Sequence, residues 1–371
     1  MKVAIVGTRG IPNIYGGFEQ FAQEISIRLI EKGIEVVVYR DKKLYPDSDD
    51  RYINGVEIRD VLTPKILPKI LQQHVYDWYS IKDLSQSDID IALFCGHSTS
   101  FPGILFFKKK LSLITIVNPD GIEWKRKSGN LTFFLQLWNL ISERLSLRLY
   151  DHIVSDNVGI QKYLYQSYGL SSDCITYGVD INPMNNTSEK TFSASGIYDL
   201  IVARIVPENN IEMIISGYLK SVNTEKLIVI GNISSNYANK LVRKYSQHNK
   251  IKFIGGVYDR KLLNSYIQNS RIYFHGHSVG GTNPSLLEAM ALKAHIYAHS
   301  NIFNKSLLEE NAWFFEDKKE VSELINNYSK SIFTTYSLKN YSKVCSQNSW
   351  EVITTQYINL FKKVLYARNN K

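Results

Sequence analysis

A glycine-rich segment near the start of the chain has the composition of an anion-binding loop. Residues 7–19, GTRGIPNIYGGFE, follow the apolar run KVAIV and contain four glycines. The spacing of Gly7 and Gly10 does not fit G-x-G-x-x-G, and Gly16 lacks the following Lys and Ser of a triphosphate-binding loop. Gly16 and Gly17 nevertheless precede an expected helix, where open backbone amides favour a phosphate. A tight strand-to-helix turn without a ligand is the alternative.

Four further segments place polar side chains at the ends of expected strands, where doubly wound sheets bind ligands. FCGHSTS and NPDGIEW follow apolar runs in the first half of the chain, and VARIVPENN and HGHSVGGTNP follow apolar runs in the second half. A carboxylate at such an edge can take the proton of a hydroxyl group, and an arginine fork can hold two phosphate oxygens. The candidates are His97, Asp120, Arg204, Gly280 and Gly281.

Alternating strand-like and helical runs must position these residues. KVAIV, IEVVVYR, DIDIALFCG, SLITIVNP and HIVSDN read as strands in the first half, with a helix over residues 18–32 that ends before Gly33. Periodicity fails over residues 177–196, where Asn, Ser, Thr and Gly dominate, and a second strand–helix series then begins. The length of 371 residues also favours two domains. We therefore predict an α/β fold with two doubly wound units.

Charge and cysteine content narrow the class of protein. The formal net charge is +9, and the excess of Lys and Arg falls in residues 179–371. A basic surface can attract nucleic acid, anionic lipid or a phosphorylated small molecule, but the sequence has no zinc-finger spacing, RNP-like motif or basic region with heptads, which disfavours nucleic acid. Three dispersed cysteines, and the lack of a signal-peptide core or a long apolar run, predict a cytoplasmic protein without a membrane span.

Two short motifs look like metal sites but have simpler explanations. Asp88 and Asp90 form a D-x-D pair, yet they precede the apolar run IALFCG and are expected to begin that strand. His275 and His277 lack a third ligand at zinc spacing. We therefore expect no metal site, and we expect these histidines to line a cleft or to pack.

Taken in order, GTRGIPNIYGGFE, NPDGIEWKR, VARIVPENNIEMII and HGHSVGGTNPSLLEAMALKA resemble the motifs of family 4 glycosyltransferases. They are most similar to those of the bacterial rhamnosyltransferases that build capsule, O-antigen or cell-wall polysaccharides. The resemblance spans nearly the whole chain and implies a GT-B fold, in which two Rossmann-like domains face each other across a cleft. Residues 1–178, with a returning C-terminal helix over residues 345–371, would form the acceptor domain, and residues 179–344 the donor domain. The resemblance also implies a retaining transferase that needs neither metal nor cofactor.

On the donor side the resemblance assigns residues one by one. Arg204 matches the family's diphosphate-binding arginine, whereas Asn209 stands where a lysine is usual and supplies only neutral hydrogen bonds. Glu288 matches a carboxylate that accepts hydrogen bonds from the donor ribose, with a role at the start of a helix as the simpler alternative. Gly280 replaces a second family glutamate, which leaves room for the methyl group of a 6-deoxy sugar. Backbone amides expected to face the donor are those of Gly16, Gly17, Gly280, Gly281, Thr282 and Asn283.

On the acceptor side, Asp120 is the group expected to take or orient the proton of the acceptor hydroxyl, although Asp-Gly is also an ordinary turn. His97 is expected to touch acceptor or donor, with a structural role as the alternative. The remaining acceptor contacts are predicted to be Tyr15, Glu19, Glu123 and Trp124.

Residues 101–150 mix clustered Lys and Arg with Trp, Phe and Leu, as in FFKKKL and LTFFLQLWNLISERLSLRLY. Such a segment is typical of a face that meets anionic lipid, and a buried helix is the alternative. Together with the resemblance, it predicts a peripheral enzyme on the inner face of the plasma membrane. That enzyme would transfer L-rhamnose from dTDP-L-rhamnose, its nucleotide-sugar donor, to a polyprenyl-diphosphate-linked saccharide acceptor.

Two other functions stay open on the sequence. One is a sugar-nucleotide epimerase, which shares the GT-B fold. The other is a non-catalytic nucleotide-sugar-binding partner of a polysaccharide assembly complex, which would suit the absence of a glutamate at Gly280 and of a lysine at Asn209.

Overall fold

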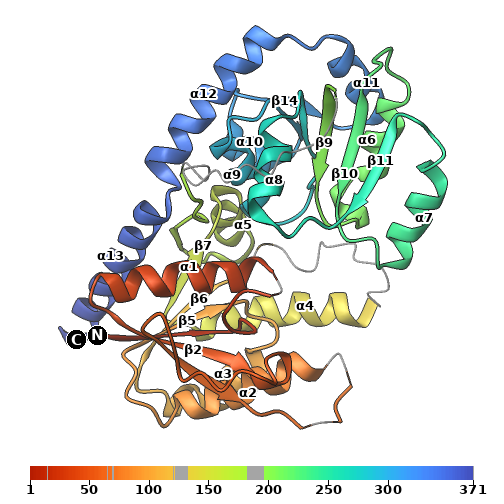
Figure 1. Cartoon of the computed structure of the whole chain (residues 1–371). Helices are drawn as coiled ribbons and strands as arrows, with labels where there is room; N and C mark the ends of the chain where they lie inside the picture. The colour runs from red at the N-terminus through yellow and green to blue at the C-terminus, as the bar shows by residue number, and fades with distance from the viewer. Residues whose placement is uncertain are drawn as a thin grey trace. The chain divides into compact units, whose positions relative to one another are not determined.

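The computed structural model describes residues 1–14, 16–64, 66–68, 71–119, 121, 133–181 and 196–370, with no side-chain description for residues 133–136 (Figure 1). The chain divides into two compact units. Unit 1 comprises Met1–Trp124, Phe133–Tyr177 and Trp350–Lys371, and unit 2 is chiefly Gly178–Ser349. Each unit is built on a largely parallel sheet whose strands alternate with helices, so the predicted pair of doubly wound α/β units is confirmed.

The sheet of unit 1 has the strand order β3-β4-β2-β1-β5-β6-β7-β8, and its pairs are parallel except for β3 with β4. Its strands are β1 (Lys2–Val6), β2 (Glu35–Asp41), β3 (Tyr52–Ile53), β4 (Val56–Val61), β5 (Ile91–Cys95), β6 (Ile114–Asn118), β7 (His152–Ser155) and β8 (Asp173–Cys174). Its α-helices are α1 (Gly17–Glu31), α2 (Gln72–Leu84), α3 (Phe101–Phe107), α4 (Phe133–Ser146), α5 (Val158–Tyr168) and α13 (Trp350–Asn369).

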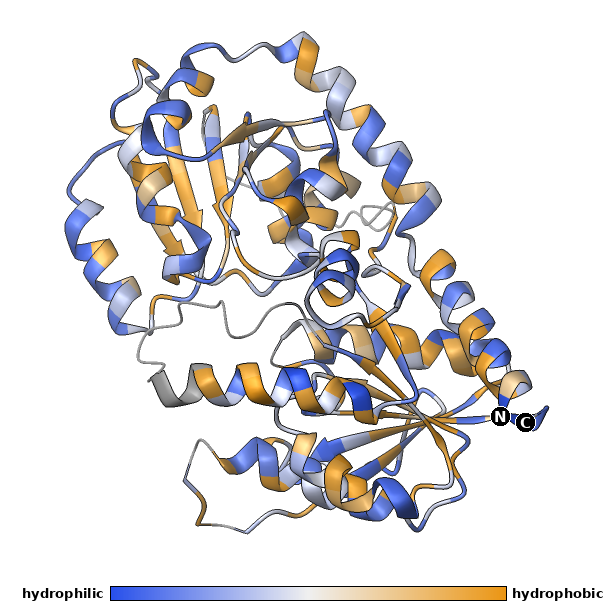
Figure 2. Cartoon of the chain, turned by 180° about the vertical axis from the view of Figure 1, so that it is seen from behind, coloured by the Kyte–Doolittle hydropathy of each residue, from blue (hydrophilic) through white to orange (hydrophobic). Residues whose placement is uncertain are grey.

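The central strands of unit 1 are mostly apolar, as expected of parallel strands covered on both faces. KVAIV, IALFC and ITIVN supply β1, β5 and β6, and they are coloured as hydrophobic in Figure 2. Gly33 follows α1 with a φ of 76°, which only a glycine adopts readily, and so ends the helix where the sequence predicted. Because β1 connects outward to β2 on one side and β5 lies on its other side, the switch point of the sheet falls between β1 and β5.

The C-terminal helix α13 packs within unit 1 against α1. The ring of Tyr357 lies 5.5 Å from the ring of Phe21, measured between centroids, and Trp350 lies 5.3 Å from Tyr177. The chain thus returns to its first unit at its end.

The sheet of unit 2 is parallel throughout, with the order β11-β10-β9-β12-β13-β14. Its strands are β9 (Tyr198–Val202), β10 (Lys226–Ile230), β11 (Ile251–Gly255), β12 (Tyr273–His275), β13 (Ile296–His299) and β14 (Trp313–Phe315). Its α-helices are α6 (Ile211–Tyr218), α7 (Asn236–Tyr245), α8 (Arg260–Gln268), α9 (Pro284–Ala291), α10 (Ile302–Leu308), α11 (Lys318–Asn326) and α12 (Lys330–Gln347). The switch point falls between β9 and β12.

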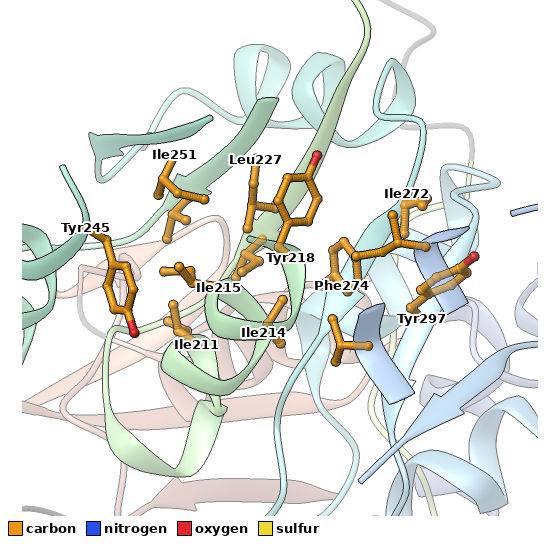
Figure 3. Packing of buried hydrophobic residues seen from close by; sticks show 14 of the residues in the cluster. Ile211, Ile214, Ile215, Tyr218, Leu227, Tyr245, Ile251, Ile272, Phe274 and Tyr297 are labelled. Atoms are coloured by element: carbon orange, nitrogen blue, oxygen red, sulfur yellow. The ribbon is translucent and has the colours of Figure 1, made fainter. Parts of the chain in front are cut away.

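The core of unit 2 forms where α6 covers the sheet (Figure 3). Ile214, Ile215 and Tyr218 are fully buried against strand residues such as Leu227 and Phe274. At the start of β9, the buried carboxylate of Asp199 accepts hydrogen bonds from Tyr218 at 2.8 Å and from the Arg271 guanidinium at 2.9 and 2.5 Å. Burial raises the pKa of Asp199, and Arg271 opposes that shift. This pairing lies at the amino ends of the strands, which leaves the opposite edge of the sheet for a site.

Candidate functional site

The glycine-rich loop of unit 1 is held by side chains from several elements. The Glu19 carboxylate accepts a hydrogen bond from the Arg9 amide at 2.9 Å. The Tyr45 hydroxyl donates to the carbonyls of Gly10 and Pro12 at 3.1 and 2.8 Å. The loop between β1 and α1 is therefore fixed in shape, and Glu19, which the sequence placed on the acceptor side, is buried beneath it.

Gly16 and Gly17 form the start of α1, as predicted for an anion-binding turn. Gly16 is the N-cap and is extended at a φ of −166°, and no side chain caps the helix. A β-carbon on Gly16 would lie 3.3 Å from a carboxylate oxygen of Glu19. With no capping side chain, the first amides of α1 can receive an oxygen from a ligand.

His97 follows β5 at the same edge of the sheet, but its side chain is fully buried. Its Nε2 atom lies 3.8 Å from Oε2 of Glu143 on α4. The other oxygen of Glu143 accepts hydrogen bonds from the hydroxyls of Tyr163 and Tyr168, both at 2.6 Å. Burial, followed by the hydrogen bond to Glu143, raises the pKa of Tyr168. In this structure His97 contacts protein atoms, and Glu143 is a buried partner that no sequence motif signalled.

A second buried carboxyl group, Asp77 on α2, lies close to the segment that follows His97. It accepts hydrogen bonds from Gln73 at 3.2 Å and from Thr99. Burial raises its pKa to about 7, and these two hydrogen bonds oppose the shift. Sequence reasoning missed Asp77 because it lies within a helix and follows no strand.

Four predicted acceptor-side residues lie outside the described residues, namely Tyr15, Asp120, Glu123 and Trp124. The strand before Asp120, β6, ends at Asn118, whose carbonyl accepts a hydrogen bond from the Gly96 amide at 2.8 Å. In sequence, Asp120 therefore follows a strand that neighbours the strand preceding His97, and its role stays a prediction.

In unit 2, the loops that follow β9 and β12 interlock at the switch point. Asn209 donates to the Arg204 carbonyl at 2.7 Å, and its side-chain oxygen lies 2.7 Å from Nδ1 of His277. Asn210 donates to the Gly276 carbonyl at 2.9 Å. A β-carbon on Gly276 would lie only 2.1 Å from the Asn209 carbonyl oxygen, so the close approach requires glycine. The buried Asn209 amide thus joins the two loops, whereas the sequence assigned it to the donor.

Arg204 is exposed at the carboxyl end of β9. Its backbone is anchored by Asn209, while its guanidinium makes no ion pair with another described residue. An exposed guanidinium beside a fixed loop can hold two oxygens of a diphosphate.

The loop after β12 leads into α9 through the predicted glycines. Gly280 has a φ of 126°, a backbone conformation that side chains rarely allow. Thr282 is buried, and Asn283 caps α9 by accepting hydrogen bonds from the amide and hydroxyl of Ser285 at 3.0 and 2.8 Å. The Asn283 side chain is therefore engaged within the loop, and Gly280 and Gly281 bring bare backbone to the edge of the sheet.

Glu288 on α9 is paired with Arg260, a residue that sequence reasoning missed. Nη2 of Arg260 lies 3.0 Å from Oε1 of Glu288, and its Nη1 lies 3.4 Å from Oδ2 of Asp180. Arg260 begins α8 directly after β11, so the same rule that singled out strand ends at β9 and β12 could have found it. The pair places a partly buried carboxylate next to an exposed cation, and the predicted role of Glu288 at the donor ribose stays a prediction.

Burial lowers the pKa values of two histidines at this edge, His275 and His299. Burial lowers the pKa of His275 well below its ordinary value, and His277 and His299 lower it further. Burial also lowers the pKa of His299. Within the part of the chain that the structure describes, no cluster of His, Cys, Asp and Glu could hold a metal ion. In unit 1, the D-x-D pair precedes β5 as expected, with Asp90 accepting a hydrogen bond from the Lys2 amide at 2.7 Å.

Two family models match the sequence. Residues 1–180 match a domain of unknown function, DUF1972, and residues 188–343 match glycosyl transferases group 1. No curated protein matches the chain.

Solved structures share the fold over the whole chain. Sucrose-phosphate synthase from Thermosynechococcus elongatus has a TM-score of 0.82 at 14% identity, with 99% of each chain covered. A glycosyltransferase from Rickettsia africae has a TM-score of 0.72 at 14% identity, with 98% of each chain covered. HepE from Anabaena, solved with UDP, has a TM-score of 0.73 at 14% identity, covering 98% of this chain and 100% of its own. The likeness establishes the predicted GT-B fold.

Proposed function

We propose that the chain is a retaining glycosyltransferase of bacterial surface polysaccharide synthesis, a proposal supported by the match of residues 188–343 to glycosyl transferases group 1. Its donor is a nucleoside-diphosphate sugar, with dTDP-L-rhamnose the first choice. Its acceptor is a polyprenyl-diphosphate-linked saccharide at the inner face of the plasma membrane. The observation that carries the proposal is the exposed Arg204 on the loop that interlocks with the glycine loop of β12.

Several features of unit 2 support a diphosphate at this edge. Arg204 offers a positive fork, and Gly280 and Gly281 offer backbone amides without side chains. Glu288 offers a carboxylate oxygen to the ribose hydroxyls. The HepE structure, which shares the fold, contains UDP, and the same protein was also solved with UDP-glucose. A nucleotide-sugar donor fits these groups better than a free sugar would.

The proposed reaction makes one bond and breaks one bond at the anomeric carbon of the donor sugar. The acceptor hydroxyl oxygen attaches to that carbon, and the bond from the carbon to the diphosphate oxygen breaks with retention of configuration. Arg204 and the loop amides stabilise the negative charge of the leaving diphosphate, a contribution that grows as the bond breaks. Asp120 takes or orients the proton of the acceptor hydroxyl.

Rhamnose is proposed from the resemblance to the rhamnosyltransferases, in which Gly280 stands where other family members have a glutamate. Without that polar side chain, the position is better suited to the methyl group of a 6-deoxy sugar. A sugar with a 6-hydroxyl group would leave that hydroxyl without the partner that a glutamate would provide. A transfer assay that compares donors with and without a 6-hydroxyl group therefore tests the choice of rhamnose.

The test is a transfer assay with the full chain, a membrane-lipid extract and radiolabelled dTDP-rhamnose, UDP-glucose, UDP-galactose or GDP-mannose. We expect sugar to enter the lipid fraction from dTDP-rhamnose. Arg204→Ala should lower the rate roughly a hundredfold, as loss of one charge-stabilising donor does elsewhere, and Arg204→Lys should fall in between. Arg243→Ala, at an exposed arginine of α7, is the matched control and should leave the rate unchanged.

Other outcomes would replace the proposal. Conversion of the donor without any acceptor would indicate an epimerase. Protection of the protein by a donor against heat, without transfer to any lipid, would indicate a nucleotide-sugar-binding partner. Unchanged transfer by both Arg204→Ala and Asp120→Ala would reject the site.

A further inference from the structure

Helix α4 of unit 1 is seated with its polar side inward and its apolar side outward. The buried side carries residues at 0%, 1% and 0% exposure, namely Ser142, Glu143 and Ser146. The opposite side carries apolar residues spaced four positions apart at 40%, 43% and 49% exposure, namely Leu137, Ile141 and Leu145. A surface helix normally buries its apolar stripe. α4 therefore reverses the usual arrangement.

Contacts made by Glu143 hold α4 in this orientation. Its Oε1 atom accepts hydrogen bonds from Tyr163 and Tyr168 at 2.6 Å, and its Oε2 atom lies 3.8 Å from His97. Turning the helix to bury Leu137 and Ile141 would break these contacts. The apolar exposure is thus a consequence of specific buried interactions.

Helix α3, which contacts α4, also carries exposed apolar residues. Trp138, which is 36% exposed, lies 6.0 Å from the ring of Phe101 at the start of α3. Leu105 and Phe106, near the end of the same helix, are 60% and 61% exposed. We call this the α3–α4 surface, comprising Leu105, Phe106, Leu137, Trp138, Leu140, Ile141 and Leu145. Exposed apolar side chains grouped on two neighbouring helices mark a candidate interaction site.

The charges that border the α3–α4 surface are positive. Arg144 on α4 and Arg148, in the short helical turn over Leu147–Leu149 that follows it, are exposed, and Lys109 and Lys110 follow α3 directly. Nζ of Lys110 lies 5.8 Å from the centre of the Phe106 ring. The acidic residue of α4, Glu143, is buried on the opposite side. Apolar side chains bordered by cations complement a bilayer that carries anionic headgroups.

We propose that the α3–α4 surface docks onto an anionic lipid bilayer, with the apolar residues entering the headgroup region and the arginines contacting lipid phosphates. A second copy of the chain is a poorer occupant, because a two-fold pairing of this surface would face arginine with arginine and offer no carboxylate. The inference rests on the proposed function, because a lipid-linked acceptor would bring the enzyme to a membrane. Figure 1 shows α3 and α4 in unit 1, and none of the helices built from described residues is long and apolar enough to cross a bilayer.

The test is sedimentation of the full chain with vesicles of phosphatidylcholine alone or with phosphatidylglycerol. We expect binding to the anionic vesicles only. Arg144→Gln with Arg148→Gln should weaken that binding roughly twenty-five-fold, at about fivefold per arginine. Leu137→Gln with Ile141→Gln and Leu145→Gln should abolish it. Matched controls on other helices are Lys240→Gln with Arg243→Gln and Ile332→Gln with Leu338→Gln, which should leave binding unchanged.

Donor binding is measured on the same proteins as protection from thermal unfolding by nucleotide, without lipid. Retained protection shows that a variant is folded, and separates failure of the docking surface from failure of the proposed function. The inference is overturned if the unaltered chain ignores anionic vesicles, or if the α4 variants bind them as well as the controls do. It is also overturned if the chain sediments as a dimer that the leucine variants dissociate.

Discussion

Oε1 of the Glu288 carboxylate lies 3.0 Å from Nη2 of Arg260. If Glu288 accepts hydrogen bonds from a ribose, Glu288→Gln should weaken donor binding about tenfold, because a charged acceptor is replaced by a neutral one. Arg260→Ala should weaken it by about fivefold or less, because this exposed arginine only orients the carboxylate. Calorimetric titration with the donor nucleotide measures both effects.

The control for this pair is Lys261→Ala, one residue along α8, which should bind donor as the unaltered chain does. Both Glu288→Gln and Arg260→Ala should keep the thermal midpoint of unfolding, since surface pairs contribute little stability. Equal donor affinity for Glu288→Gln and the unaltered chain would remove Glu288 from the donor site.

Asp77 makes the stability of the protein depend on pH. Its pKa is raised to about 7 in the folded state by burial, above the ordinary value of an unfolded aspartate, so the folded state binds more protons between these two values. Its contribution to stability is therefore full below the unfolded pKa and is lost as pH rises through 7. Asp77→Asn should be more stable than the unaltered chain at pH 8, with the difference vanishing near pH 4. Urea unfolding at several pH values measures this, and a constant difference would contradict it.

Single residues show where sequence reasoning reached its limit. Arg204 and Gly280 could be singled out in the sequence because a strand end and a motif mark them, and they lie on loops that the structure joins. Their roles stay predictions. The pairing of Arg260 with Glu288, and that of Glu143 with His97, joins residues from separate helices and loops. No spacing rule connects such positions, so only a three-dimensional structure could show them.

At the scale of elements, the loop between β1 and α1 depends on a glycine that touches a neighbouring strand. Gly10 has a φ of 112°, and a β-carbon there would lie 2.5 Å from Cγ of the buried Arg40. Gly10→Ala should lower the free energy of unfolding by about 2 to 3 kcal/mol, through overlap added to backbone strain. Gly33→Ala is the matched control, because its φ is 76° with no neighbour within 4 Å, and it should cost about 1 kcal/mol. Chemical denaturation measures the free energy of unfolding of both variants. Equal losses would contradict the prediction, because they would mean that the structure shifts to remove the overlap with Arg40.

The elements themselves were the most predictable part of the protein. Strands such as β1, β5 and β6 could be predicted from apolar runs, because strands covered on both faces need apolar residues. Helix α4 was harder, since its apolar stripe fitted both a core helix and a lipid-facing helix. The direction in which that stripe faces depends on the contacts of Glu143 with Tyr163 and Tyr168. These tyrosines lie on another helix, so the sequence of α4 alone does not reveal them.

At the scale of the whole molecule, unit 1 is completed by the last helix of the chain. Truncation after Ser349 removes α13 and with it the buried side chains of Trp350, Tyr357 and Phe361. Since loss of one buried aromatic side chain costs about 3 to 5 kcal/mol, unit 1 should lose its fold. Unit 2 keeps its own core and should retain protection against hydrogen exchange. Tyr366→Ala, at an exposed residue of α13, is the control and should leave both units protected.

Hydrogen exchange followed by mass spectrometry resolves the two units separately. Loss of protection in both units would show that neither folds without the other.

Within the described residues, the chain passes between the units at Tyr177–Gly178 and again at Ser349–Trp350. In unit 2 the Val179 amide donates to the Asn348 carbonyl at 2.8 Å, and in unit 1 the ring of Tyr177 lies 5.3 Å from that of Trp350. Each unit therefore holds its own two chain ends side by side. In genetic terms, residues 178–349 form a cassette bounded by two neighbouring breakpoints. Recombination at these breakpoints would exchange unit 2 for that of a relative while leaving the core of unit 1 unchanged.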